Sequence, residues 1–217
     1  MMRSYNQYCA LARALDVVGD RWTLLIVREL LIHKSCRYTD LRNGLPGIAT
    51  NLLACRLREL EQAGLVERKE APPPIATTLF HLSARGLELE PIVMEFTRWG
   101  APLLSKTSRT DEFRTHWLTL PLKLHLVDEN PEGPPLQLEL RTGDGRVTIE
   151  AAGGGITARP GPSPHADAVL SGSPQVVLGL LAGKLDLGQA RLAGLQLEGD
   201  AAVQQGVLQR VRLKTGK

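Results

Sequence analysis

One predicted helix, from about Thr50 to Ala63, carries side chains that could read the edges of DNA bases. At 100° per residue the leucines of this segment share one face, and the opposite face is polar. Asn and Gln can form two hydrogen bonds with adenine and Arg two with guanine, while a small Ala would let the helix lie close to the bases. The alternative is that these side chains only form a solvated helix face. The polar face consists of Asn51, Ala54, Cys55, Arg58 and Gln62.

Three helical patterns precede this segment. Ala10–Gly19 ends on Gly, a common helix stop, and Asp20 is the expected N-cap of a second helix over Arg21–Leu31. Thr39 is expected to cap a short third helix over Asp40–Leu45.

A turn and a β-ribbon flank the polar helix. Pro46-Gly47 interrupts the chain before it, and the strand-like runs "LVERKE" and "TTLFHL" follow it, joined by "APPPIA". Prolines cannot lie in a central ladder, so the ribbon should be exposed. Helix, turn, helix and ribbon is the order of a winged helix-turn-helix, whose second helix lies in the major groove of double-stranded DNA. The predicted DNA contacts are Thr50, Asn51, Ala54, Cys55, Arg58, Arg68 and Lys69.

A last helix in the first half, capped by Ser83 and running to about Leu104, carries an apolar stripe, and Pro91 is expected to kink it. A helix at the end of a small domain has few partners left in its own chain. We therefore expect a two-fold homodimer in which this helix and the first one form most of the interface. The alternative is core packing within one chain. The stripe consists of Leu89, Ile92, Phe96, Trp99 and Leu103.

Catalytic chemistry has little support in the sequence. The chain lacks a G-x-S-x-G elbow, a G-x-x-x-x-G-K phosphate loop and an H-E-x-x-H motif. Its three cysteines and five histidines are scattered without metal-ligand spacing. We expect no metal site, no cofactor and no catalytic residue, and an enzyme would depend on a pocket that the sequence does not reveal.

Length and charge point to two domains, of which the first meets any polyanion. The chain has 217 residues and 43% hydrophobic residues, enough for two modest cores. Residues 1–110 hold 15 Lys and Arg against 11 Asp and Glu, whereas residues 111–217 hold 11 against 12. No apolar run approaches the roughly 20 residues of a membrane span, so we expect a cytoplasmic protein without a membrane partner.

The second half alternates apolar and polar residues, as strands do. Leu120–Val127 and Leu136–Gly153 are predicted strands, with a hairpin turn at Gly143-Asp144-Gly145. A helix is expected within "SPQVVLGLLAG", a strand within "LAGLQLEGD" and a final helix over "AAVQQGVLQRVRL". The predicted fold class is therefore α+β, with domains at 1–107 and 113–217.

Residues of about 5–105 resemble the HxlR-type transcription regulators. The motifs are "CALARALDVVGDRWTLLIVREL", "RYTDLRNGLPGI" and "RLRELEQAGLVERK", followed by "FHLSARG" and "EFTRWG". The resemblance implies a dimeric winged-helix DNA-binding protein. The family's ribbon often carries Pro-Arg near the start of its second strand, where this chain has Ala76 and Thr77. Arg68 and Lys69 could partly replace that contact.

The same resemblance implies a candidate redox sensor, because some members sense oxidants through a Cys at the start of the domain. Cys9 occupies that position, and Arg13, one turn later, could favour its thiolate. The alternative for Cys9 is a buried small hydrophobe. Cys55 could mimic a sensor, because its modification would block the DNA face directly.

Residues of about 115–213 resemble sterol-carrier-protein-2-like domains through "DAVLSGS", "LLAGKLD" and "LEGD". The resemblance implies a sheet with helices that enclose an apolar cavity. We expect the helices Pro174–Ala182 and Ala201–Val211 to form its walls and an apolar small molecule to be the ligand. The alternatives are a filled cavity or a dimerisation aid. The candidate lining residues are Val177, Leu180, Leu181, Val207 and Leu208.

Together these patterns favour a sequence-specific, DNA-binding transcription regulator modulated by thiol modification or by an apolar ligand. The alternative is a carrier of lipids or other apolar ligands whose first half serves mainly for dimerisation.

Overall fold

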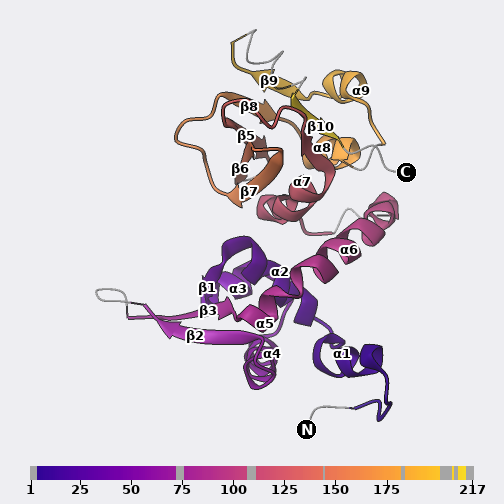
Figure 1. Cartoon of the computed structure of the whole chain (residues 1–217), viewed down its shortest axis with the longest axis vertical. Coiled ribbons are helices and arrows are strands. Elements are labelled where there is room, and N and C mark those ends of the chain that lie inside the picture. Colours follow the sequence, from indigo (N-terminus) through magenta and orange to yellow (C-terminus); the bar gives the residue numbers. More distant parts are fainter. Residues whose placement is uncertain are drawn as a thin grey trace. The chain divides into compact units, whose positions relative to one another are not determined.

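The computed structural model describes residues 4–71, 76–106, 111–143, 145–181, 184–200, 207 and 210–213. Both helices and sheets are present, which confirms the predicted α+β class (Figure 1). The chain divides into two compact units, Met1–Val93 and Met94–Lys217. The domain limits predicted from the sequence, 1–107 and 113–217, stay a prediction. None of the helices within the described ranges combines the length and apolarity that crossing a bilayer requires.

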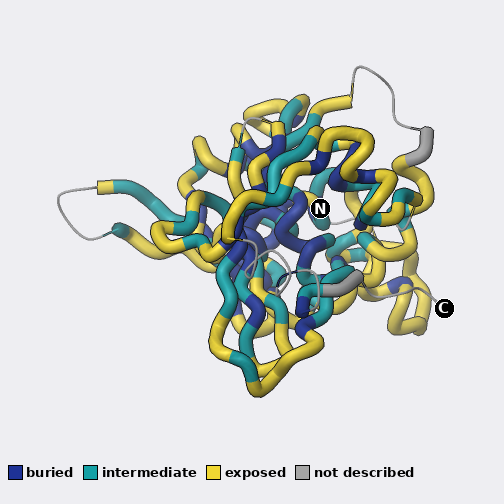
Figure 2. Tube along the Cα trace, turned by 90° about the horizontal axis from the view of Figure 1, so that it is seen from above, coloured by how far each residue is buried: buried dark blue, intermediate teal, exposed yellow. Residues whose placement is uncertain are grey.

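The first unit surrounds a small antiparallel sheet with helices. Its elements are α1 (Ala10–Val18), α2 (Thr23–His33), β1 (Ser35–Arg37), α3 (Tyr38–Gly44), α4 (Thr50–Gln62), β2 (Val66–Glu70), β3 (Thr78–Leu82), α5 (Ala84–Leu87) and the start of α6 (Glu90–Gly100). The rest of α6 and the 3-10 helix η1 (Ala101–Lys106) belong to the second unit. The strand order is β1-β3-β2, and β2 and β3 project as an exposed ribbon (Figures 1 and 2). The prolines predicted at the ribbon tip, residues 72–74, lie outside the described residues.

Helix α4 forms where the leucine periodicity predicts it. Leu53, Leu57 and Leu60 are buried, so its apolar face belongs to the core of this unit. The helix ends where Gly64 turns with a φ of +70°, a conformation that glycine adopts without steric cost. The Leu65 N–H then donates to the Leu60 carbonyl at 2.9 Å, a hydrogen bond that commonly closes such a helix end.

The predicted N-cap of α2 is wrong. The helix begins at Thr23 rather than Arg21, because Trp22 adopts a left-handed backbone conformation with a φ of +80°. The carboxylate of Asp20 instead forms an ion pair with Arg56 of α4 at 2.5 Å. The connection between α1 and α2 is thereby held against α4.

The predicted cap of α3 is also wrong. Thr39 lies inside the helix, which begins at Tyr38. The Arg37 N–H donates to the Asp40 carboxylate at 3.0 Å, so a side chain inside the first turn satisfies the helix start.

Ser83 caps a helix as predicted, since its Oγ accepts from the Gly86 N–H at 3.0 Å. The single helix predicted behind it is two, because α5 ends at Leu87 and α6 begins at Glu90. Pro91 explains the break. A proline lacks the N–H and its ring collides with a preceding helical turn, so it is accommodated only in the first turn of a new helix.

The second unit contains a five-stranded sheet of order β7-β6-β5-β8-β9 and a separate β10-β4 pair. Its elements are η2 (Thr115–Leu118), α7 (Thr119–His125), β4 (Leu126–Asp128), β5 (Leu136–Thr142), β6 (Gly145–Ala152), β7 (Gly155–Pro160), β8 (Ala168–Ser171), α8 (Pro174–Leu181), α9 (Leu187–Leu192), β9 (Gln196–Glu198) and β10 (Val211–Leu213). β5 and β8 are parallel, whereas the other neighbours are antiparallel. One face of the sheet is buried with α8 in a common core.

The strand predicted over Leu120–Val127 is wrong, because most of the segment forms α7 and only its end enters β4. Alternation is ambiguous here, since the segment is rich in Leu, a good helix former, and has no β-branched residue before Val127. Pro121 lies in the first helical turn, where backbone N–H groups have no partner within the helix.

Other predictions for the second unit hold in part. β5 and β6 meet at the predicted hairpin, whose residue 144 lies outside the described residues, and α8 and β9 occur where predicted. The sequence prediction missed β7, β8 and α9. Most of the final helix, predicted over Ala201–Val211, lies outside the described residues, but Val211 itself pairs with Asp128 as a strand.

A buried ion pair joins distant segments of the second unit. Arg210 Nε donates to Asp128 Oδ1 at 2.7 Å, and its Nη2 donates to the Ala151 carbonyl at 3.0 Å. Its Nη1 donates to the Pro134 carbonyl. Asp128 also accepts from the Gly154 N–H at 3.2 Å. The Arg210 guanidinium thus joins β4, β6 and the segment that leads to β5, and the Asp128 carboxylate also holds the turn after β6.

Candidate nucleic-acid interface

The turn before α4 positions the helix against α3. The Tyr38 hydroxyl of α3 donates to the Thr50 carbonyl at 2.6 Å, in the first turn of α4. Gly47 adopts a φ of +86°, and an added Cβ there would lie 3.8 Å from the Trp22 ring. The turn is therefore packed under Trp22, and the two helices of the helix-turn-helix are held together.

The structure brings the predicted reading residues onto one side of α4. Thr50, Asn51 and Arg58 are exposed, whereas Ala54 and Cys55 are half-buried. Arg58 Nε donates to the Ala54 carbonyl at 3.3 Å, and within the described chain Arg58 has no carboxylate partner. The charge of Arg58 is thus available to an outside acceptor.

Two further polar residues of this helix make local contacts. Asn51 Oδ1 accepts from the Leu52 N–H at 2.9 Å, and the Cys55 thiol donates to Glu59 Oε1 at 3.5 Å. The hydrogen bond of Asn51 uses its amide oxygen and not its amide nitrogen, which is a donor.

The ribbon carries two cations in different situations. Arg68 Nη2 donates to Glu61 Oε2 of α4 at 2.7 Å, and its guanidinium lies 5.3 Å from the centre of the Phe80 ring. The hydrogen bond to Glu61 holds the pKa of Arg68 above its ordinary value. Arg68 would have to release Glu61 to contact a phosphate fully. Lys69 is exposed and has no carboxylate partner within the described chain.

Two exposed arginines beside this surface, Arg37 and Arg42, were not among the contacts predicted from the sequence. In the sheet register Arg37 and Lys69 both pair with Leu79, so they flank it on one face of the sheet. Arg42 is exposed in the last turn of α3. Arg42 could have been found by scanning the first helix of the motif for phosphate contacts. Only the strand register, a long-range feature, aligns Arg37 with Lys69.

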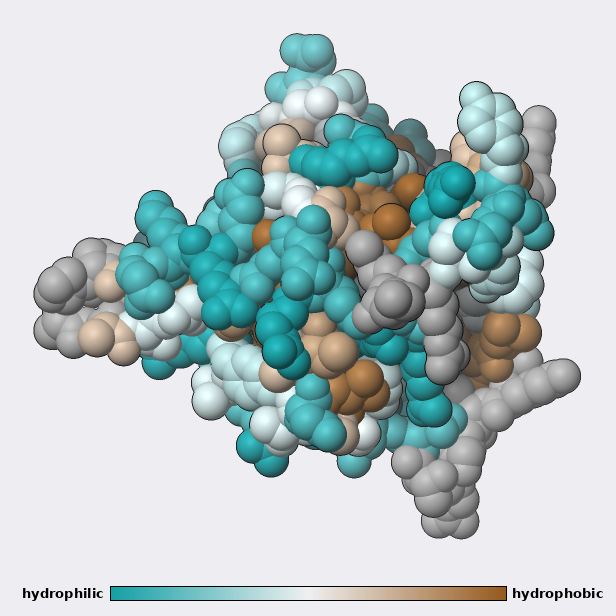
Figure 3. Space-filling view, turned by 90° about the horizontal axis from the view of Figure 1, so that it is seen from below, coloured by the Kyte–Doolittle hydropathy of each residue, from teal (hydrophilic) through white to brown (hydrophobic). Residues whose placement is uncertain are grey.

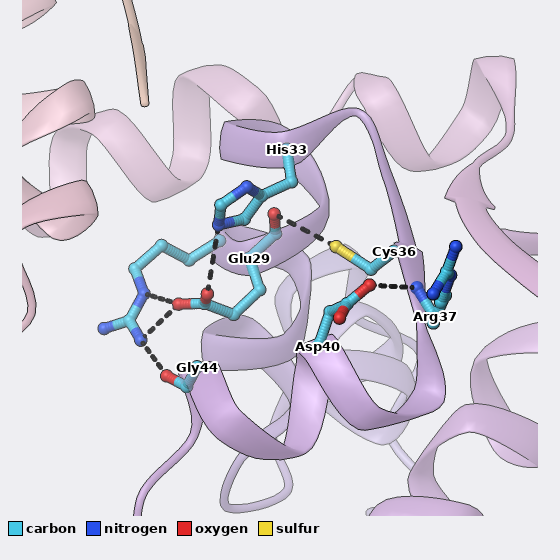
Figure 4. A network of polar contacts seen from close by, with 7 residues as sticks. Glu29, His33, Cys36, Arg37, Asp40 and Gly44 are labelled. Carbon is cyan, nitrogen blue, oxygen red and sulfur yellow. Dashed lines mark hydrogen bonds and ion pairs between the residues drawn. The ribbon is translucent and has the colours of Figure 1, made fainter. Parts of the chain in front are cut away.

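A buried carboxylate fixes the first part of the motif (Figure 4). Glu29 is 1% exposed, and its Oε1 accepts from Arg28 Nε at 3.0 Å and from Arg28 Nη2 at 2.7 Å. A Cβ at Gly44 would lie 2.3 Å from Glu29 Oε2, so only glycine lets α3 approach α2 this closely. The network joins α2 to α3, because Arg28 Nη2 also donates to the Gly44 carbonyl at 3.5 Å.

The three thiols differ in their surroundings. Cys9 is exposed at the start of α1, Cys55 is half-buried and Cys36 is buried. Burial, followed by the charges of Glu29 and Asp40, raises the pKa of Cys36 to about 12, which leaves it a thiol at neutral pH. Arg13, expected to favour a Cys9 thiolate, lies 3.6 Å from Asp16, so part of its charge is already balanced.

Apolar side chains reach the surface of α6 and its continuation. Patches of apolar surface interrupt the hydrophilic face drawn in Figure 3. Leu89, the first residue of the predicted stripe, is half-buried. The others are exposed, at 44% for Ile92, 57% for Phe96, 72% for Trp99 and 57% for Leu103. On α1, Leu11 and Leu15 are exposed by 68% and 40%.

The candidate ligand-lining residues of the second unit lie in its core. Val177, Leu181 and Val207 are buried members of the cluster behind the sheet, and Leu180 packs against it. Leu208 lies outside the described residues.

Comparisons with known proteins match the two halves of the chain to two different families. Residues 17–108 match the family model of the HxlR-like helix-turn-helix, and residues 130–209 match that of the SCP-2 sterol transfer family. The uncharacterized HTH-type transcriptional regulator YdzF of Bacillus subtilis (strain 168) is 34% identical over 86 residues, which are 40% of this chain and 79% of that protein.

A second relative is similar through both units. The uncharacterized HTH-type transcriptional regulator Rv3095 of Mycobacterium tuberculosis is 32% identical over 171 residues, which are 76% of this chain and 92% of that protein. Because that alignment is longer than the first unit, it extends into the second. Among solved structures, the redox regulator HypR in its oxidized form is 29% identical with a TM-score of 0.41, covering 46% of this chain and 99% of that chain.

Proposed function

The chain belongs to the family of HxlR-like helix-turn-helix transcription regulators, and we propose that it binds a two-fold symmetric DNA site as a homodimer. The observation that supports this most is the polar face of α4, on which Arg58 is exposed and has no carboxylate partner within the described chain. In this proposal α4 of each copy lies in one major groove. The chain is then a regulator, cytoplasmic and not an enzyme.

In this proposal the residues that contact base edges differ from those that contact phosphates. Arg58 and the Asn51 amide would contact base edges, because both project from α4 toward the exposed side. Lys69, Arg37 and Arg42 would contact phosphates from the ribbon and from α3. Arg68 plays a smaller part than its sequence position indicates, because Glu61 already pairs with it.

Substitution of the proposed guanine contact tests this assignment. We expect Arg58→Ala to weaken operator binding by about 1–3 kcal/mol and to relax specificity at one base pair of each half-site. Fluorescence anisotropy with the operator and its single-base variants measures both effects. Operator affinity equal to that of the wild type would refute the recognition role of α4.

Two variants give the contrast that this experiment needs. Lys69→Ala should weaken binding to operator and unrelated DNA alike and lower the salt slope by about one unit, as loss of a phosphate contact does. Arg85→Ala removes the same charge from α5, where Arg85 pairs with Glu88, and should leave operator affinity within about twofold.

The homodimer is proposed from the exposed stripe on α6 and the exposed leucines of α1. Phe96 and Trp99 are both more than half exposed and lie on the same stripe. Single exposed apolar residues are common on protein surfaces, but a stripe with two aromatic side chains is typical of an interface. A two-fold interface would bury this stripe against its own copy.

Thiol modulation is proposed for Cys9 because it is the exposed cysteine of the three. We expect a maleimide to label Cys9 first, Cys55 more slowly and Cys36 only on unfolding, as followed by mass spectrometry. Labelling at Cys9 should change operator affinity, and Cys9→Ser should abolish that change. If only Cys55→Ser abolishes it, the thiol effect is a direct block of the DNA face.

Binding of an apolar ligand by the second unit is a second candidate function. It is supported by the match to the SCP-2 sterol transfer family over residues 130–209. If such a ligand changes operator affinity a hundredfold, the coupling is about 2.7 kcal/mol and operator must change ligand affinity by the same factor. A fluorescent fatty acid titrated with and without operator distinguishes a coupled regulator from an independent carrier module.

A further inference from the structure

The second unit has a pocket at the edge of its sheet that the apolar-ligand proposal does not use. The pocket is about 330 Å³ in volume and is lined by Arg141, Thr142, Gly143, Gly145, Arg146 and Gly172. These residues end β5, begin β6 and follow β8. β5 and β8 are parallel neighbours, so the pocket lies beyond the carboxyl ends of two parallel strands. Ligands of open sheets often bind at this kind of edge.

Two guanidinium groups meet at this pocket because of the strand register. Arg141 of β5 and Arg146 of β6 are direct cross-strand partners, so their side chains leave the same face of the sheet. The side chains are 44% and 50% exposed. Like charges placed directly opposite each other are destabilising. Two guanidinium groups this close therefore need a negative charge beside them, from the protein or from a ligand.

The compensating partner is the carboxylate of Glu139, which is 2% exposed. Its Oε1 accepts from Arg141 Nε at 2.7 Å and lies 3.6 Å from Arg146 Nη1, while its Oε2 accepts from the Ser163 N–H at 2.9 Å. The hydrogen bonds hold the pKa of Glu139 below its ordinary range, first through Arg141. The carboxylate orients both arginines from behind, and the three side chains keep a net charge of +1.

A helix end beside the pocket also favours an anion. The glycines there serve close packing, because an added Cβ would lie 2.8 Å from Thr115 at Gly145 and 2.9 Å from Leu195 at Gly172. The Gly172 N–H donates to the Arg141 carbonyl at 3.2 Å, which holds Gly172 beside the end of β5. Helix α8 begins at Pro174, two residues beyond Gly172, and its amino end carries a partial positive charge. Among the described residues, the buried Oγ1 of Thr142 has no hydrogen-bond partner, and the side chain lies on the core face of β5, opposite to Arg141.

We propose that this pocket binds the oxyanion group of a small ligand, a carboxylate or a phosphate, between Arg141 and Arg146. Planar guanidinium groups bind both anions through paired hydrogen bonds, and the hydrogen bond from Arg141 to Glu139 uses Nε rather than a terminal nitrogen. The pocket is a site of different chemistry from the aliphatic core around Val177 and Leu181.

The test is an NMR titration of the full ¹⁵N-labelled chain at constant ionic strength, with inorganic phosphate in one arm and octanoate in the other. We expect saturable shifts of the Gly143, Gly145 and Gly172 amides. Arg146→Gln should weaken binding at least tenfold, because it removes one guanidinium and leaves the Arg141–Glu139 pair intact. Arg159→Gln is the matched control. Arg159 is exposed on β7 of the same sheet and does not line the pocket, so binding should stay within twofold.

A double variant separates a built site from net charge. Glu139→Gln with Arg141→Gln removes one charge of each sign, so the net charge of the protein is unchanged, and it leaves no buried carboxylate unpaired. It should also weaken binding at least tenfold. Tighter binding of octanoate than of phosphate would assign the site to the head of an apolar ligand, and the reverse order to a free phosphate compound. The proposal is overturned if neither anion gives saturable shifts at these glycines, or if Arg159→Gln weakens binding as much as Arg146→Gln.

Discussion

Phe96→Asp is expected to convert the protein from a dimer to a monomer and to lower its affinity for a two-half-site operator at least a hundredfold. Phe96 is 57% exposed on α6, so in the proposed two-fold interface its ring is buried only by the second copy. Burying a Phe side chain stabilises by about 1.5–3 kcal/mol, and a two-fold interface contains the residue twice. A loss of about 3 kcal/mol or more in the dimer corresponds to a factor above a hundred.

Sedimentation at micromolar concentration measures the association state, and anisotropy with full and half operators measures the DNA affinity. The variant should keep its helix content, because the substituted position is already in water in the single chain. Leu192→Asp is the control. Leu192 is 92% exposed on α9, which is not one of the helices of the proposed interface, and its variant should remain a dimer. A dimeric Phe96→Asp protein with normal operator binding would show that the stripe is not the interface.

Arg210→Ala is expected to destabilise the second unit by about 3–5 kcal/mol. The substitution leaves the buried carboxylate of Asp128 without its ionic partner and frees the Ala151 and Pro134 carbonyls. Removal of one member of a buried pair costs this much because the remaining charge stays desolvated. Urea unfolding followed by circular dichroism gives the difference in free energy. Arg191→Ala, a surface change on α9, should stay within about 0.5 kcal/mol of the wild type.

The same pair predicts how stability depends on pH. The hydrogen bond from Arg210, and then the backbone N–H groups of Asn130 and Gly154, lower the pKa of Asp128 in the folded state. A lowered pKa means that the stabilisation is fully present above the ordinary Asp value of about 3.9 and is lost as the pH falls through the folded value. Asp128→Asn should therefore flatten the loss of stability below about pH 4. An unchanged pH profile would contradict this role of the pair.

The sequence by itself determined those local elements whose signals lie within a few residues, of which α4 is the example. The leucine spacing of α4 and the glycine after it specify both the helix and its end, since a 3.6-residue period and a positive φ are local properties. The polar face of α4 follows from the same spacing, so the candidate DNA-contact residues could be named in advance. Motifs spread over the first half were also sufficient to identify the family.

The tertiary structure decided which charges pair, because pairing depends on register and on segments far apart in the chain. Arg68 and Glu61 meet only when β2 folds back along α4, and Asp128 meets Arg210 across 82 residues. The alternating Leu120–Val127 could be a strand or a helix, and only its place in the folded unit made it α7. The facing arginines 141 and 146 are likewise a product of the hairpin register, which places two residues of separate strands on one face.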